Sequence, residues 1–197
     1  MKKLIGILMV ALISTAATAQ ESPNKLGLVM SLGLNTGGDT LASGTYTNGE
    51  SFSIKAGGGT LLSIGAAYLV NDKIDIQATI GHESDSTDAV NGSINFKRSP
   101  MEVLGFYNFN DSYRLGAGLR QVSSATLTTS GVAARLGSSD FSASAGTVLE
   151  GQYFFTPRVA EKKLRLGLFV RYVTEKYTSG STTVNGDHLG MGLTAHY

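Results

Sequence analysis

His82 and Ser84 would project from the same face of a strand, with Glu83, Asp85 and Asp88 close by in the chain. A serine, a histidine base and an orienting acid are the groups that ester hydrolysis requires. This spacing fixes no carboxylate beside the histidine, so the hydrophilic start of a loop is the favoured interpretation, and we predict that the protein is not an enzyme. The three acids could hold a divalent cation, but they do not match the EF-hand pattern. We expect no metal and no cofactor.

A second group of charged residues recurs along the middle and the last third of the chain. Its predicted members form one layer of Glu102, Arg120, Glu150 and Arg171 and a second layer of Asp75, Arg114 and Arg165. Carboxylates beside arginines can serve acid and base catalysis. In a narrow interior, however, the main effect of pairing opposite charges is to lower the free-energy cost of burying them. We therefore predict a structural charge network, with a gated, low-conductance pore as the alternative.

Strands must position these groups, because apolar and polar side chains alternate along the chain. In the last stretch, Leu189, Met191, Leu193 and Ala195 share one face before the terminal Tyr197. The charged residues lie on the face opposite the apolar one. Seven further stretches alternate in the same way, near residues 26–35, 60–68, 74–80, 101–109, 113–119, 143–155 and 164–172.

The connections between these strands alternate in length. Short ones lie near 69–73, 110–112 and 156–163, and long polar ones lie near 36–59, 83–97, 121–140 and 174–187. Short turns at one end and long loops at the other are typical of transmembrane barrels. A barrel of eight strands has an interior just wide enough to be filled by side chains. The predicted fold is all-β: an eight-stranded antiparallel up-and-down transmembrane β-barrel.

The amino-terminal residues predict export. Lys2 and Lys3 precede an apolar run and small residues that end at Ala19, so residues 1–19 are expected to be a signal peptide and residues 20–197 the barrel domain. The chain has no cysteine, which excludes a disulfide framework. Its net charge of +1 argues against general nucleic-acid binding.

Aromatic side chains gather where the apolar face meets the short turns or the carboxyl terminus. This predicts an interfacial girdle made of Tyr68, Phe109, Tyr113, Phe155 and Tyr197. A second, outer girdle of Tyr172 and Tyr177 is expected to be weaker, because the chain has no tryptophan.

The strand pattern and the terminal aromatic resemble small bacterial outer-membrane β-barrels of the OmpA and OmpX type. The resemblance implies a bacterial outer-membrane location and recognition of the closing strand by the barrel assembly machinery. His82 and Ser84 are also similar in spacing to the His-x-Ser pair of outer-membrane lipid A deacylases. They differ in location, because they end an early strand rather than lying late in the chain.

The predicted partners are outer-membrane lipid and lipopolysaccharide, whose phosphates would pair with basic residues at the outer rim. The alternative is that these basic residues only make the loops soluble. Those residues are Lys55, Lys97, Arg98, Arg135 and Lys176. We predict a monomeric barrel with a filled polar lumen and long extracellular loops, in a structural or adhesin-like surface role that allows a surface ligand. A low-conductance channel is the alternative, and an outer-leaflet lipid-modifying enzyme using His82 and Ser84 is a distant one.

Overall fold

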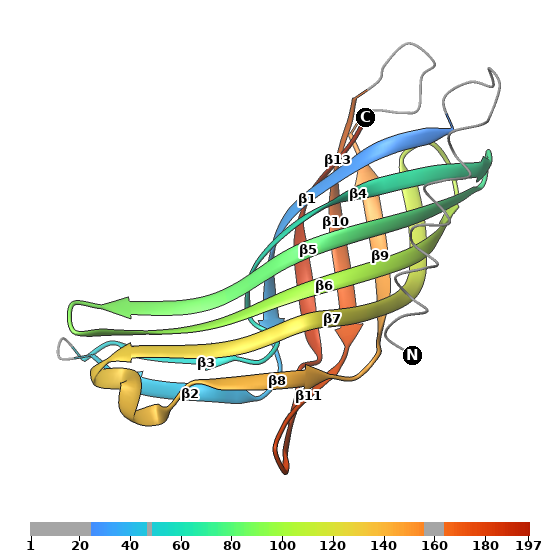
Figure 1. Cartoon of the computed structure of the whole chain (residues 1–197). Helices are drawn as coiled ribbons and strands as arrows, with labels where there is room; N and C mark the ends of the chain where they lie inside the picture. Colours follow the sequence, from blue (N-terminus) through green and yellow to red (C-terminus); the bar gives the residue numbers. More distant parts are fainter. Residues whose placement is uncertain (1–24, 47–48, 156–163) are drawn as a thin grey trace.

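Eight antiparallel strands close into a barrel in the computed structural model, which describes residues 25–46, 49–155 and 164–197 (Figure 1). The predicted fold class is thus confirmed, while the predicted signal peptide and the turn at 156–163 lie outside the described residues. The barrel strands are β1 (Leu26–Gly37), β4 (Gly59–Asn71), β5 (Ile74–Ala89), β6 (Gly92–Asn108), β7 (Tyr113–Gly131), β9 (Gly146–Phe154), β10 (Arg165–Thr174) and β13 (His188–His196).

The barrel closes where the last strand pairs with the first. β13 lies antiparallel to β1, with Leu32 opposite Leu193, and β7 pairs with β9 to complete the ring. Closure leaves no free edge around the barrel, so its backbone N–H and C=O groups find partners within the sheet. Within the described part of the chain, no helix is long and apolar enough to cross a membrane.

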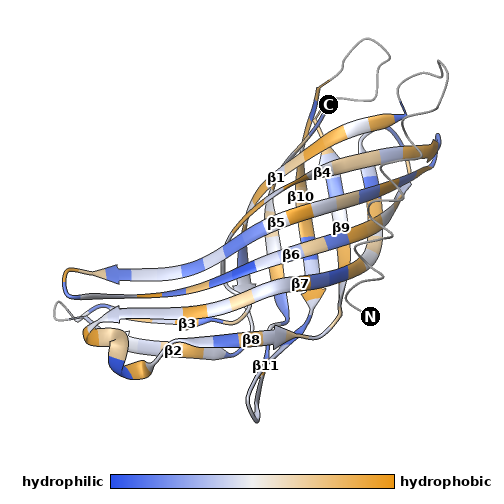
Figure 2. Cartoon of the chain, viewed as in Figure 1, coloured by the Kyte–Doolittle hydropathy of each residue, from blue (hydrophilic) through white to orange (hydrophobic). Residues whose placement is uncertain are grey.

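Side chains alternate between the two faces of the barrel wall. Along β10, Leu166, Leu168 and Val170 are exposed on the outside, while Phe169 and Arg171 are buried in the lumen. The outer band of the barrel is accordingly coloured as hydrophobic in Figure 2. This is the reverse of a water-soluble protein, and a surrounding apolar solvent accounts for it.

At the end of the barrel away from the two described termini, the chain forms a second layer of structure, which we call the crown (Figure 1). Strands β5, β6 and β7 run on past the barrel, and β5 and β6 are joined by a two-residue turn at 90–91. The crown also contains β2 (Thr40–Thr45), β3 (Ser51–Lys55), the 3-10 helix η2 (Val132–Leu136), β8 (Ser139–Ala143), β11 (Lys176–Ser179) and β12 (Thr182–Asn185).

Polar loops were expected at 36–59, 83–97, 121–140 and 174–187. In the structure these segments contain the strands and the 3-10 helix of the crown. These segments alternate as strands do, but their apolar side chains face inward and their polar ones face outward, so a search for apolar-outward strands overlooks them. Ile94, Phe96 and Leu127 are buried in a core that Ile54, Ala56, Val122, Ala125 and Tyr177 complete. The sixth barrel strand also starts at Gly146 rather than at Ala143, because Ala143 ends β8.

A bulge in β7 marks the boundary between barrel and crown. Val122 pairs with Pro100, but Ala125 pairs with Arg98, so β7 carries one extra residue there. Both Ser123 and Ser124 are therefore exposed, and the buried positions change from even to odd numbers. An extra residue bends and twists a strand, which fits the way β7 leaves the barrel toward one side in Figure 1.

The first prediction concerns the exposed apolar band. Replacing Leu168 by arginine puts a charge on the surface expected to face lipid, which should lower the free energy of unfolding by about 2 to 4 kcal/mol. Urea titration of protein folded in lipid vesicles measures this. The control is Thr128→Arg on the exposed face of the crown, which should cost little, and equal losses would show that the faces are wrongly assigned.

Candidate functional site: the charged lumen

Arg120 on β7 lies at the centre of a buried cluster of ion pairs. Its guanidinium group contacts three carboxylates, those of Glu83 on β5, Glu102 on β6 and Glu175 just after β10, each at 2.7 Å. Arg120, Glu83 and Glu175 have fully buried side chains. One side chain thus connects strands on different sides of the lumen.

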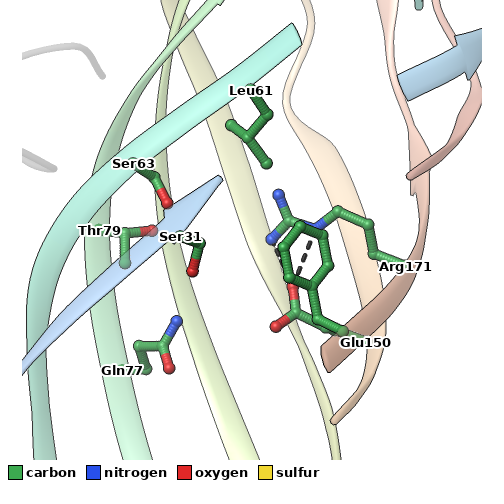
Figure 3. A pocket seen from close by; sticks show the side chains of 8 residues that line it. Ser31, Leu61, Ser63, Gln77, Thr79, Glu150 and Arg171 are labelled. Carbon is green, nitrogen blue, oxygen red and sulfur yellow. Dashed lines mark hydrogen bonds and ion pairs between the residues drawn. The ribbon is translucent and has the colours of Figure 1, made fainter. Parts of the chain in front are cut away.

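Arg171 on β10 extends the cluster toward the middle of the barrel. Its Nη2 atom lies 2.7 Å from Glu102 and 2.6 Å from Glu150 on β9, and Figure 3 shows the pair with Glu150. A β-carbon at Gly190 would lie 3.0 Å from Cγ of Arg171, so a glycine at that position leaves room for the arginine.

Arg98 ties the crown to the same cluster. Its guanidinium lies 3.2 Å from Glu83 and 3.5 Å from Glu175, and it also donates to the backbone carbonyl oxygens of Ala56 and Gly58. The Tyr177 hydroxyl donates to Glu175. Burial raises the pKa of Tyr177, and the negative charge of Glu175 acts in the same direction, so the phenol stays protonated and able to donate.

A lower layer surrounds Arg114 near the other end of the lumen. Arg114 pairs with Asp75 at 3.2 Å, donates to Gln77 and Gln152, contacts His196 at 3.0 Å, and lies over the Phe106 ring at 4.0 Å. Gln152 also donates to Glu150, so the two layers form one connected network. Beneath them, Arg165 stacks on Phe154 at 3.9 Å and donates to the Asp111 carbonyl.

All seven residues expected in the network have buried side chains in the lumen: Asp75, Glu102, Arg114, Arg120, Glu150, Arg165 and Arg171. Sequence reasoning missed Glu83, Arg98 and Glu175. Glu83 and Arg98 are opposite each other in the β5–β6 register and are on the inward faces of both strands, so extending these two strands would have found them. Glu175 lies between β10 and β11, and buried and exposed positions go on alternating from Arg165 to Tyr177, so extending the seventh predicted strand would have found it as well.

Two expectations for exposed residues are corrected. Arg98 is fully buried and unavailable to lipid phosphates, whereas Lys97, Arg135 and Lys176 are exposed and Lys55 is partly so. Tyr177 is buried in the crown core and is not part of an outer girdle; Tyr172 is exposed. Among the acids near His82, Glu83 points into the lumen and is paired there, so it does not join Asp85 and Asp88 in a surface cation site.

The serine and histidine near the end of the barrel section of β5 do not assemble a hydrolytic site with these acids. His82 is exposed on the outer face, and the Ser84 hydroxyl donates to the Asn95 side chain. Glu83 faces the opposite side of the strand, and Asp85 accepts a hydrogen bond from the Lys55 backbone. These contacts place neither Glu83 nor Asp85 where it could orient His82.

A buried group of Glu83, Glu175 and His188 has ligand atoms within 4.8 Å of one another, a spacing that a metal ion could use. Both carboxylates already contact Arg98 and Arg120. The two guanidinium charges oppose a further cation, so we assign no metal to this group.

The aromatic residues expected in the inner girdle are exposed at the end of the barrel where the described termini lie. They are Tyr68, Phe109, Tyr113, Phe155 and Tyr197. Tyr107 and Tyr153 add to them: Tyr107 contacts Phe109, and Tyr153 contacts Tyr113 and Phe155, with ring centres 4.8 to 5.7 Å apart. This arrangement is what an interfacial girdle requires.

Comparison with known proteins places this architecture in a family. Residues 5–196 match the model of the outer membrane protein beta-barrel domain. The chain belongs to this family. It is accordingly an integral protein of the bacterial outer membrane, and the crown corresponds to its surface loops.

Solved structures show similar small barrels at low sequence identity. Neisserial surface protein A is 14% identical over 89% of this chain and 97% of its own, with a TM-score of 0.48. OprG of Pseudomonas aeruginosa is 15% identical over 87% and 95%, with a TM-score of 0.42. Ail of Yersinia pestis is 11% identical over 86% and 97%, with a TM-score of 0.46. A search of curated proteins finds no match to this outer-membrane barrel.

The second prediction tests whether the lumen residues act as a unit. Arg171→Ala removes the guanidinium that contacts Glu150, and stranding a buried charge should cost about 3 to 5 kcal/mol of unfolding free energy. Removing Glu150 and Arg171 together should cost less than the sum of the two single changes. Urea titration in vesicles gives all three values, with Leu168→Ala on the outer face of β10 as a control. Additive losses would contradict a shared network.

Proposed function

We propose that this protein is a closed barrel that anchors the crown at the cell surface, where the crown takes an adhesin-like or structural role. The proposal depends most on the contacts of Arg120 with Glu83, Glu102 and Glu175. These contacts cross the lumen between the crown and the lower layer, where a solute would have to pass. Separating them would leave several buried charges unpaired, at a cost of several kcal/mol each.

The lumen beside this cluster is also tightly filled. The gap between Arg171, Glu150 and the hydroxyl side chains of Ser31, Ser63 and Thr79 has no space for a water-sized sphere. Figure 3 shows the side chains that line it. A conducting pore needs a continuous wet path, and a constriction without water is an effective barrier to ions. The ion pairs across the lumen and this constriction therefore favour an anchor over the alternative of a low-conductance channel.

The crown has the properties of a stable surface platform. It has its own apolar core, in which the Phe96 ring packs edge-on against both Phe141 and Tyr177 at 5.6 Å. Arg98 holds the segment between β3 and β4 through the carbonyl oxygens of Ala56 and Gly58. Preorganised surfaces lose less entropy on binding than mobile loops do, which suits a binding role.

Basic residues on the crown suit contact with lipopolysaccharide, whose phosphates are bound well by lysine and arginine. Lys55, Lys97 and Lys176 remain on the surface for this role, and Arg135 is exposed in η2. We further propose that the closing strand β13 with Tyr197 is the segment that the barrel assembly machinery recognises, and that the barrel functions as a monomer.

The third prediction tests the closed lumen in planar bilayers. Wild-type protein should give no stepwise ion currents. Replacing Glu102, Arg120, Glu150 and Arg171 together by serine removes two acids and two arginines and leaves Glu83 and Glu175 with Arg98 as their partner. This variant should give measurable ion currents, because water replaces the ion pairs that cross the lumen.

Heat-dependent migration on a denaturing gel shows whether each variant still folds as a barrel. Wild-type currents as large as those of the quadruple variant would contradict the closed lumen. A folded quadruple variant that stays silent would show that other groups close it.

A further inference from the structure

Three large hydrophobic side chains of the crown are exposed, and they lie in two neighbouring segments at its far end. They are Val90, Val132 and Leu136, which we call the apolar tip. Every other exposed large hydrophobic residue of the described chain belongs to the barrel wall or to the rim where the described termini lie. The apolar tip is therefore the one described apolar surface that the barrel's own membrane does not account for.

Two neighbouring segments form the apolar tip. Val90 is in the turn between β5 and β6, and Val132 and Leu136 are the first and last residues of η2. The Val132 amide donates to the Asn91 carbonyl at 2.9 Å, which joins the two segments. Figure 2 shows hydrophobic colour at both places, at the end of the crown farthest from the barrel.

Local structure does not explain these side chains. Val90 occupies a two-residue turn, where glycine, asparagine and aspartate are usual, and it is 110% exposed. None of the residues of η2 is buried. The crown core is already complete without them, so exposing three aliphatic side chains gains nothing for folding. Exposed apolar groups that folding does not require indicate an external apolar partner.

The composition of the apolar tip favours a lipid surface as that partner. A specific protein interface buries about 800 Å² on each side and usually centres on tryptophan, tyrosine or arginine anchors. Three aliphatic side chains at the end of a hairpin provide neither the area nor an aromatic anchor. A bilayer needs only projecting apolar groups and a cation for its phosphates, and the exposed Arg135 lies between Val132 and Leu136 in the chain.

We propose that the apolar tip inserts into the surface of a second membrane that faces the cell, with Arg135 pairing with a lipid phosphate. A single tip binds weakly, and many barrels in one outer membrane provide the avidity. This inference rests on the proposed surface role of the crown but not on the closed lumen.

The absence of tryptophan from the chain provides a clean reporter. Val90→Trp protein is held in nanodiscs and mixed with vesicles of phosphatidylcholine and phosphatidylglycerol. Its emission should shift to the blue, and lipids with brominated acyl chains should quench it. The matched control is Thr182→Trp at the exposed β11–β12 hairpin of the crown, whose emission should not change.

Co-flotation of nanodiscs with the same vesicles tests the native side chains. The triple variant V90S/V132S/L136S should bind at least tenfold less than wild type, whereas T178S/T182S/T183S should bind as wild type does. Arg135→Gln should weaken binding to the anionic vesicles more than to vesicles of phosphatidylcholine alone.

Three outcomes would overturn the proposal. The proposal is wrong if wild-type nanodiscs do not float with vesicles. It is also wrong if the variant V90S/V132S/L136S binds vesicles as well as wild type does. Tip-dependent association of nanodiscs with one another without vesicles would make a second copy the partner instead. Conductance of the same purified proteins is recorded separately in planar bilayers, so failure of the closed lumen is distinguishable from failure of the tip.

Discussion

A buried arginine in a narrow barrel must be surrounded by acids, and Arg120 meets this constraint with three of them from separate segments of the chain. Glu83, Glu102 and Glu175 reach it only if β5, β6, β7 and β10 keep their observed registers. A shift of one residue in any of these strands would turn its charge toward lipid, where charge is costly. The ion-pair cluster therefore selects the register of the wall as well as filling the lumen.

The same ion-pair cluster lies at the boundary between the barrel and the crown, where the inner face changes from polar to apolar. Below it, the wall has apolar side chains outside and polar ones inside; above it, the crown has polar side chains outside and an apolar core. The bulge at Ser123 and Ser124 makes this change possible in β7, and Arg98 spans the boundary by binding Glu83 on one side and the Ala56 carbonyl on the other. One long strand can thus lie in lipid along the barrel and in water along the crown.

A closed lumen changes where function has to be located. If nothing passes through the barrel, its activity must lie on surfaces, and the crown provides a surface with its own packed core beyond the membrane. Most of that surface is polar, so the cluster of Val90, Val132 and Leu136 at its end stands out chemically. Stiff strands that continue from the barrel place this cluster far from the barrel's own bilayer, which is the geometry that contact with another surface requires.

The sequence by itself determined the elements that obey a local rule. Alternation with period two located the barrel strands, put Arg120 and Glu102 inside, and put Tyr68 and Tyr197 at one rim, because side-chain direction in a strand follows from position alone. Only the tertiary structure decided which charges meet. Glu175 follows the end of a strand and joins Arg120 through a contact between residues far apart in the chain. The crown was missed for a related reason: its strands alternate too, but their interior is formed by segments that lie far apart in the chain and meet only in the tertiary structure.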